Sequence, residues 1–229
     1  MNEINMMNML KAGVHFGHQK AKRHPKMEPF VYAIRNNVSI IDLRQSLEKL
    51  EEAKEFAKKI TGRKGTILFV GTKKQTKKIV KEAAEKCGMP CVTERWLGGT
   101  LTNFKIILKR VEKFKRMVDE KESGEWKDKY TKKEQVEFSK DIKRMELKFG
   151  GIKNLNKLPE ALFVADPKEN EAAVKEANAM SIPVIAIADT DVDPSEIDYP
   201  IPANDDAIQA IKMMVGAIRE AIIESKNKD

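Results

Sequence analysis

Short, unbroken apolar runs recur along this chain and predict buried strands. The clearest runs are residues 67–70 (Ile-Leu-Phe-Val), 162–164 (Leu-Phe-Val) and 184–187 (Val-Ile-Ala-Ile). Strands that are apolar on both faces are typical of a parallel sheet with helices on each side. Residues 38–42 (Val-Ser-Ile-Ile-Asp) predict a further strand of the same layered domain.

Helical patterns alternate with these runs. They cover residues 46–60, 76–86 and 169–180. A last helix is predicted from apolar positions three and four apart: Ile208, Ile211, Val215, Ile218 and Ile222. The alternation of strand and helix predicts a layered α/β fold with a mostly parallel sheet.

The pattern changes between Leu101 and Phe149, where two amphipathic helices follow one another. The apolar positions of the first lie near a heptad seam that Lys115 interrupts: Leu101, Phe104, Leu108, Val111 and Val118. Those of the second are spaced four, three and four apart: Phe138, Ile142, Met145 and Phe149. We expect an antiparallel coiled-coil hairpin at residues 101–150, inserted into an α/β domain formed by residues 1–100 and 151–229.

Charge is divided unequally along the chain, whose formal net charge is +8. Residues 159–229 contain 6 Lys and Arg against 15 Asp and Glu, so 37 of the 43 basic and 20 of the 35 acidic residues lie in residues 1–158. A region this cationic attracts phosphate polymers through counterion release and long-range steering. Nucleic acid is therefore the first partner to expect, and residues 1–28 form a basic amino-terminal arm.

The composition indicates a folded protein with a highly charged surface, since 41% of residues are hydrophobic and 34% are charged. Two cysteines, Cys87 and Cys91, favour a reduced compartment over a disulfide scaffold. The first ten residues are too polar for a signal peptide, and no run approaches the roughly 18 to 20 apolar residues of a membrane span. These features predict a soluble, cytoplasmic protein.

The histidines raise the question of a metal site. His15, His18 and His24 lie near one another in the sequence, but the pair Cys87 and Cys91 has a three-residue spacer and no second pair accompanies it. This spacing does not match a structural zinc site. The lysines between the histidines favour a basic arm that contacts phosphates.

An aspartate run raises the same question. Asp189, Asp191 and Asp193 begin like a calcium loop, but proline stands where an EF-hand needs Gly and Glu. An acidic turn is the favoured interpretation. A looser magnesium site that includes Asp205 and Asp206 is the alternative, and ion binding by these aspartates or by the histidines stays open.

The turn after residues 67–70 is a candidate phosphate contact. Gly71 and Thr72 precede Lys73 and Lys74 where a strand leads into a helix, whose amino terminus favours anions. Neither G-x-x-x-x-G-K-[ST] nor G-x-G-x-x-G occurs in the chain, and no catalytic motif is present. We expect no cofactor and no enzyme, although a nucleotide-binding α/β enzyme remains the alternative, as does a protein scaffold that uses the hairpin alone.

Several motifs together resemble one family. The longest is residues 95–104 (Arg-Trp-Leu-Gly-Gly-Thr-Leu-Thr-Asn-Phe), and others are residues 13–18, 68–75, 165–167 and 187–190. Over nearly its whole length the chain resembles the bacterial small-subunit ribosomal protein S-two family. His24 departs from the pattern, because many members have tryptophan there.

The resemblance implies a Rossmann-like domain with a protruding hairpin, bound to small-subunit rRNA between the head and body of the particle. It implies late assembly, neighbouring small-subunit proteins as partners, and seating of the mRNA-binding protein S-one for initiation. Candidate rRNA contacts are His15, His18, Lys20, Lys22, Arg23, Lys26, Lys73, Lys74, Arg95, Asn103, Lys105, Lys109 and Arg110. Trp96 is expected to anchor packing, and Gly98 and Gly99 to form a turn that a Cβ atom would obstruct.

Overall fold

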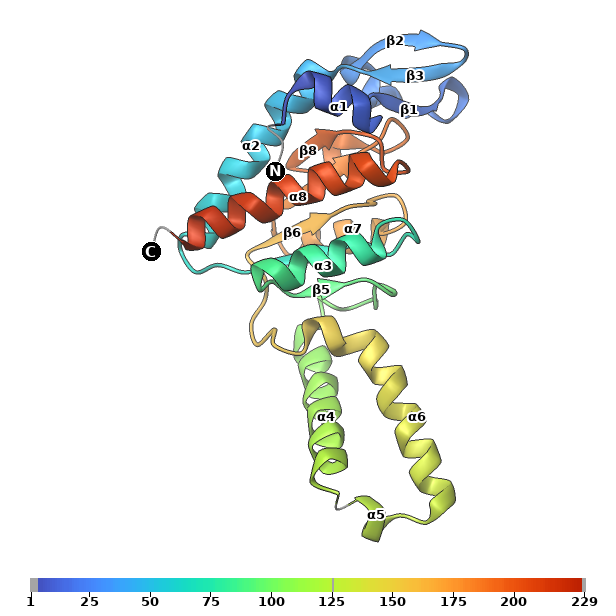
Figure 1. Ribbon diagram of the computed structural model, residues 1–229, viewed down its shortest axis with the longest axis vertical. Helices are drawn as coiled ribbons and strands as arrows, with labels where there is room; N and C mark the ends of the chain where they lie inside the picture. The colour runs from blue at the N-terminus through green and yellow to red at the C-terminus, as the bar shows by residue number, and fades with distance from the viewer. Residues whose placement is uncertain (1–3, 125, 228–229) are drawn as a thin grey trace.

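The computed structural model describes residues 4–124 and 126–227, and a parallel sheet lies at its centre (Figure 1). The strand order is β5-β4-β6-β7-β8, with every neighbouring pair parallel. The strands are β4 (Ile67–Val70), β5 (Cys91–Val92), β6 (Ala161–Val164), β7 (Val184–Ala188) and β8 (Tyr199–Pro202). Every residue of β4, β6 and β7 is buried, which confirms the strands expected from the apolar runs.

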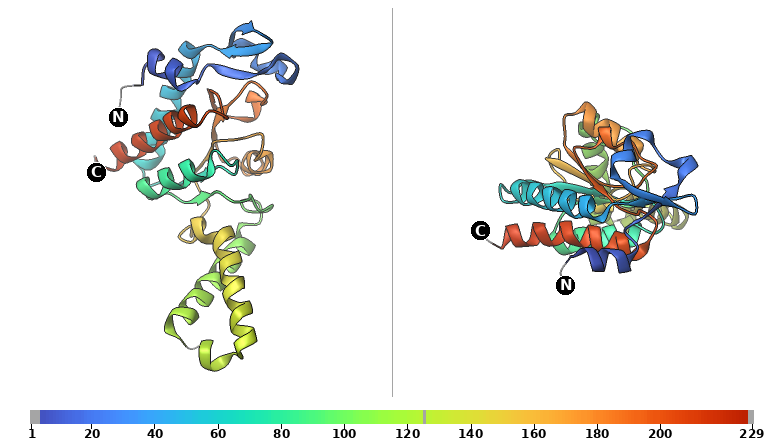
Figure 2. Two further views of the ribbon diagram at one scale, coloured as in Figure 1. Left: turned by 45° about the vertical axis from the view of Figure 1, so that its right-hand side comes forward. Right: turned by 90° about the horizontal axis from the view of Figure 1, so that it is seen from above.

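Helices cover both faces of this sheet, so the domain has three layers (Figures 1 and 2). Alternate residues of a strand face opposite sides: Phe69 lies in one core and Leu68 in the other. The core that contains Phe69 is shared with α1 (Met6–Ala12), α2 (Leu43–Thr61), α3 (Lys77–Cys87) and α8 (Ile208–Lys226). The core that contains Leu68 is shared with α7 (Glu171–Ala179). The predicted α/β layers are confirmed.

A second, antiparallel sheet lies above the first in Figure 1 and has the order β1-β3-β2. Its strands are β1 (Phe16–Gln19), β2 (Val31–Arg35) and β3 (Val38–Ile41), and the short helices η1 (Lys20–Lys22) and η2 (Pro25–Phe30) join the first two. Residues 38–41 are thus a strand, as predicted, but not a strand of the parallel sheet. Asn36 and Asn37 both have positive φ, 47° and 63°, and form a two-residue turn that pairs β3 with β2.

Three helices extend below the sheet from the side of β5 (Figure 1): α4 (Phe104–Ser123), α5 (Trp126–Lys129) and α6 (Lys132–Phe149). The helix η3 (Gly150–Ile152) leads back toward the sheet. Gly151 is required there, because a Cβ atom would lie 2.1 Å from the carbonyl oxygen of Cys91. The remaining short helix, η4 (Pro194–Glu196), precedes β8.

The seam of α4 differs from the expected one. Ile107, Val111 and Phe114 are buried in the core that contains Leu68, whereas Leu108 is half-buried. The predicted interruption at Lys115 was wrong, because Phe114 fills that turn. The heptad expected from Leu101 does not continue into α4, because Leu101 precedes the first residue of the helix. The expected positions of α6 pack into the same core: Phe138, Ile142, Met145 and Phe149. The division of the chain at residues 101–150 stays a prediction.

Candidate functional site

The basic arm divides into exposed and paired residues. Lys20 and Lys22 are exposed on η1. The guanidinium of Arg23 lies 3.4 Å from Glu28, and Lys26 Nζ lies 2.8 Å from Asp193 Oδ2. Among the residues that the structure describes, Lys20 and Lys22 form no ion pair, while Arg23 and Lys26 would have to exchange partners to reach a phosphate.

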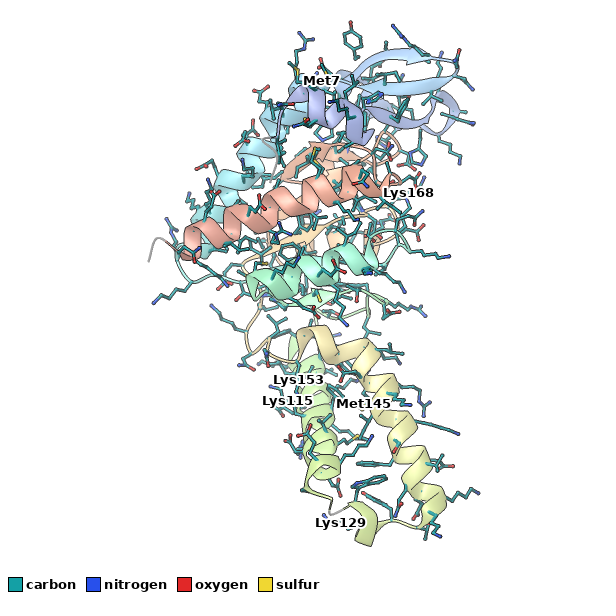
Figure 3. All side chains as sticks on the ribbon, viewed as in Figure 1. Met7, Lys115, Lys129, Met145, Lys153 and Lys168 are labelled. Atoms are coloured by element: carbon teal, nitrogen blue, oxygen red, sulfur yellow. The ribbon has the colours of Figure 1, made fainter. Side chains whose placement is uncertain are left out.

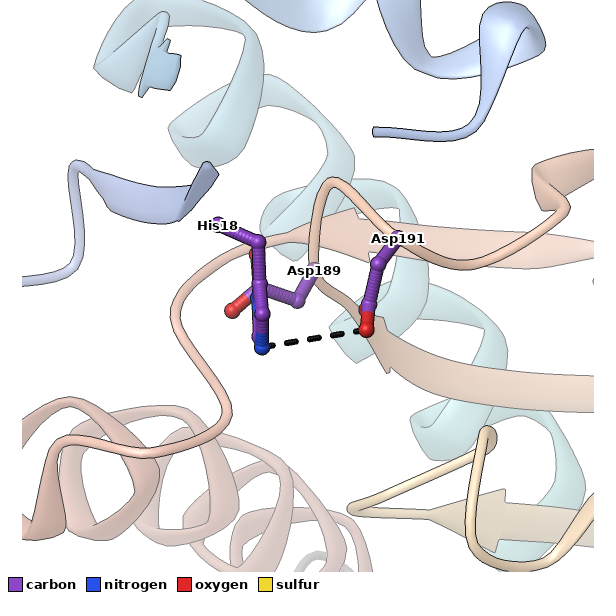
Figure 4. A group of neighbouring side chains, drawn as sticks. All are labelled: His18, Asp189 and Asp191. Carbon is purple, nitrogen blue, oxygen red and sulfur yellow. Dashed lines mark ion pairs between the residues drawn. The ribbon is translucent and has the colours of Figure 1, made fainter. Parts of the chain in front are cut away.

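The two predicted histidines of the arm have different surroundings. His15 packs against Phe16, with ring centroids 4.0 Å apart, and burial lowers its pKa. His18 points instead toward aspartates at the carboxyl end of β7 (Figure 4). Its Nδ1 lies 3.1 Å from Asp189, and its Nε2 lies 3.7 Å from Asp191 and 3.6 Å from Asp206. The Asp189 carboxylate raises the pKa of His18 more than burial lowers it.

Lys73 joins the same group of side chains, which we call the acidic cluster: His18, Lys73, Asp189, Asp191, Asp205 and Asp206. The Nζ of Lys73 lies 2.9 Å from Asp205 and 2.6 Å from Asp206. Burial works against the charged form, but these carboxylates raise its pKa well above the ordinary value. The phosphate contact predicted for Lys73 would have to break both ion pairs. Its neighbour Lys74 is exposed.

The acidic cluster has the chemistry of a divalent-cation site. Ligand atoms of His18, Asp189 and Asp191 lie within 4.8 Å of one another, as do those of His18, Asp205 and Asp206. Imidazole and carboxylate groups suit zinc, and carboxylates suit magnesium. This cluster differs from the aspartate run and from the histidine group considered as ion sites in the sequence. Asp193 pairs with Lys26 instead, and His15 packs against Phe16.

The cysteines take no part in this cluster. Cys87 and Cys91 are buried in the core that contains Phe69. Burial raises the pKa of Cys91 to about 11, so its thiol stays protonated at neutral pH and is a poor metal ligand.

The turn after β4 is filled by a side chain of the protein itself. Asp166, which follows β6, accepts hydrogen bonds at Oδ2 from the backbone N–H groups of Thr72 (3.0 Å) and Lys73 (2.5 Å). The Thr76 hydroxyl donates to the same oxygen at 3.2 Å, and Asn170 Nδ2 donates to Oδ1 at 2.9 Å. Burial raises the pKa of Asp166 to about 6. A carboxylate thus occupies the donors that a bound phosphate would need, which counts against a nucleotide site.

The loop of residues 95–103 is organised by Glu176 of α7. One carboxylate oxygen accepts from Trp96 Nε1 at 3.0 Å and from Gly99 N–H at 2.7 Å, and the other accepts from Leu101 N–H at 2.9 Å. Burial would raise the pKa of Glu176, but these donors hold it below its ordinary value. Trp96 is 8% exposed, which confirms it as a packing anchor.

The two glycines of this loop have unequal roles. Gly99 adopts a φ of +86°, which favours glycine, and its missing Cβ faces Asn103. Gly98 has open space around it, so the expectation that a Cβ atom would be obstructed there was wrong.

The remaining candidate contacts are all exposed. Arg95 lies in the loop after β5, Asn103 is the N-cap of α4, and Lys105, Lys109 and Arg110 lie in the first two turns of α4. None of the four cations among them forms an ion pair within residues 4–124 and 126–227. The arm lies at the upper end of the molecule and the start of α4 lies just below β5 (Figure 1), so the structure does not bring the two basic sets together. Glu176 carried no sequence signal, and Asp166 entered only as part of the motif at residues 165–167, because the backbone N–H groups that they bind are 74 to 94 residues away.

In the described part of the chain, no helix is both long and apolar enough to cross a membrane. The sequence model of the family described as Ribosomal protein S2 matches residues 9–225. This match includes the arm motif, the loop of residues 95–103 and the acidic cluster. The chain therefore belongs to the Ribosomal protein S2 family and is a structural component of the small ribosomal subunit, not an enzyme.

Proposed function

We propose that this protein binds small-subunit rRNA through two separated basic regions and connects the head and body of the particle. The first region is Lys20 and Lys22 of the arm, and Lys74 is a further exposed cation in the turn after β4. The second is Arg95, Asn103, Lys105, Lys109 and Arg110. The observation that carries the proposal is that these cations are exposed, while the other three candidate cations of the arm and turn, Arg23, Lys26 and Lys73, have carboxylate partners.

Recognition of this kind reads the position of phosphates rather than bases. Aromatic residues make up 6% of the chain, and Trp96 is buried. Trp96 is therefore not available for base stacking, and we expect the two basic regions to contact the RNA mainly through its phosphates. Basic regions on opposite sides of the parallel sheet suit contact with two segments of an RNA that is already folded, which agrees with late assembly.

The direct test is incorporation into particles. Cells that express a tagged copy with Lys20, Lys22 and Lys74 changed to Glu, or with Lys105, Lys109 and Arg110 changed to Glu, are lysed at moderate salt and sedimented on a gradient. We expect the wild-type protein in the small-subunit fraction and each variant depleted from it. Recovery of the wild-type protein among free soluble proteins alone would contradict the proposal.

We infer that a different surface seats S-one. An apolar groove of about 910 Å³ lies between α1 and the antiparallel sheet. Large side chains along it are about half exposed: Met6 49%, Leu10 49%, Phe16 50% and Tyr32 67%. A continuous exposed apolar surface of this kind marks a protein interface. In purified particles, Phe16→Ala with Tyr32→Ala should lower the amount of S-one bound while the bound amount of this protein stays unchanged.

A further inference from the structure

A second groove lies between α4 and α6 and has a volume of about 400 Å³, within the range of small-ligand pockets. Its floor is apolar and comes from both helices and from the loop of residues 95–103: Leu97, Met117, Met145 and Phe149. Figure 3 shows Met145 on the side of α6 that faces α4. Phe149 is 3% exposed, and the other three side chains are half-buried, so they are accessible from the groove.

The rim of this groove is cationic. Arg110 and Lys113 come from α4, and Arg144 and Lys148 come from α6. Each pair is spaced three or four residues apart and so lies on one face of its helix. Asp141 is the acidic residue of the lining and pairs with Arg144. Within the described residues, the other three rim cations form no ion pair, so the groove carries a net charge of +3.

The combination of floor and rim suits one kind of occupant. A nucleotide places a flat apolar base between two phosphates, and unpaired bases of folded RNA are commonly splayed out of the stack. Methionine side chains adapt to a flat ring and make favourable sulfur–aromatic contacts. An acidic peptide would satisfy the rim but offers a planar group for the floor only where it contains an aromatic residue, whereas every nucleotide has a planar base.

We propose that the groove between α4 and α6 binds one unstacked base of an RNA, with the rim cations on the phosphates at either side. This proposal rests on the proposed rRNA binding and adds a base-binding pocket to it. Leu97 then has a role that its neighbour Trp96, which is directed into the core, does not have.

The test compares two stem-loop RNAs with the same number of nucleotides, one with a fully paired stem and one whose stem contains bulged adenosines. We expect the full-length protein to bind the bulged RNA about tenfold more tightly, because base stacking on a protein supplies this order of energy. Met117→Ala with Met145→Ala should remove the preference and leave the affinity for the paired RNA within about twofold. The control is Ile106→Ala with Val136→Ala, side chains 53% and 55% exposed on the same helices outside the groove, and it should keep the preference.

A second measurement does not depend on the stability of the variants. With 2-aminopurine in place of a bulged adenosine, binding of the wild-type protein should change the base fluorescence. Equal affinity for both RNAs without a fluorescence change would overturn the base pocket and leave rRNA binding in place. Binding of neither RNA would contradict both proposals. A polyglutamate peptide that occupies the groove and resists displacement by RNA would assign it to a protein partner and overturn the base pocket.

Discussion

Two buried or half-buried carboxylates connect distant segments of this protein at the scale of single residues. Asp166 accepts hydrogen bonds from the turn after β4, and Glu176 accepts them from the loop that leads into α4. In each case the carboxylate accepts hydrogen bonds from backbone N–H groups that are shielded from water and would otherwise have no partner. Hydrogen bonds to an ionised acceptor are stronger than those between neutral groups. Both residues thus hold in place backbone segments that carry candidate contacts.

Glu176→Gln should lower the free energy of unfolding by about 2 to 3 kcal/mol, because the amide nitrogen cannot accept the bonds that one carboxylate oxygen accepts. Urea unfolding followed by circular dichroism measures the change. Glu171→Gln on the same helix is the control, since Glu171 is exposed and pairs with Lys175 at the surface. The control should change stability by less than about 0.5 kcal/mol, and equal effects of the two variants would argue against this role of Glu176.

The pH dependence of stability follows from the buried acids. Burial raises the pKa of Asp166 and of Asp205 to about 6, from an ordinary value of 3.8. In the folded protein each holds a proton at pH values where the unfolded chain has lost it, so stability falls as pH rises toward neutrality. The raised pKa of His18 acts in the same direction, because its contribution is lost as pH rises through the folded value. The lowered pKa of His15 acts in the opposite direction and offsets part of the effect.

We expect the free energy of unfolding to be about 1 to 2 kcal/mol higher at pH 5.5 than at pH 8 in the presence of EDTA. Acids whose pKa is lowered, such as Glu176 and Asp206, stay ionised over this range and do not change the sign. Asp205→Asn should reduce the difference. Urea unfolding at the two pH values measures it, and a stability that rises toward pH 8 would be inconsistent with these protonation states.

At the scale of elements, the helices α4 and α6 depend on a seam rather than on their own propensities. Their exposed faces are rich in Lys and Arg, and isolated helices of this length are marginal in water. Ile107, Val111 and Phe114 of α4 pack with Ile142 and Phe149 of α6 in one core. The seam therefore keeps the cations of α4 at fixed positions.

The isomeric neighbours Ile107 and Leu108 test which residue belongs to this seam. Ile107 is 4% exposed and Leu108 is half-buried outside the core. Ile107→Ala should cost about 2 to 4 kcal/mol, and Leu108→Ala less than about 1.5 kcal/mol. Thermal unfolding of both variants measures which substitution is more destabilising. A larger loss of stability for Leu108→Ala would support the heptad seam expected from the sequence.

At the scale of the whole molecule, the unequal charge becomes a spatial arrangement. The cationic arm lies on the side of β8 and the cationic start of α4 lies on the side of β5, the two edge strands of the parallel sheet (Figure 1). The aspartates of the acidic cluster follow the carboxyl ends of β7 and β8. The carboxyl ends of parallel strands are where α/β proteins usually bind ligands. In this protein, carboxylates occupy that edge, and two of them form ion pairs with Lys73 that compete with a phosphate contact.

Changing Lys105, Lys109 and Arg110 to Glu should weaken binding to duplex RNA at least about tenfold and reduce the slope of log affinity against log salt by about 2 to 3, since each phosphate contact contributes about 0.9. A salt titration of both proteins measures the slopes. The matched control changes Lys59, Arg63 and Lys86 to Glu, exposed cations at the carboxyl ends of α2 and α3. Equal losses in the two triple variants would indicate a nonspecific effect of net charge.

Much of the architecture could be predicted from local pattern. Four-residue apolar runs such as Ile67–Val70 can be buried on both faces, so they predict strands of a parallel sheet. The spacing of apolar residues in α6 gives one apolar stripe, which predicts a helix without any knowledge of what packs against it. Residues 38–41 show the limit. Their pattern indicates a strand but does not identify the partner strand, which the Asn36–Asn37 turn decides. Lys73 shows another limit, since the carboxylates that hold it lie more than 130 residues away.

The sequence by itself therefore determined the layered α/β class, the helices of residues 104–149, the cationic character of residues 1–158 and the family motifs, because these depend on residues near one another in the chain. Only the tertiary structure decided which of the candidate cations are free, that Asp166 fills the phosphate position and that His18 faces aspartates. These outcomes depend on side chains that the fold brings together from distant strand ends. The position of a charged side chain in the folded protein, not its presence in the sequence, determines whether it forms an internal ion pair or is available to a partner.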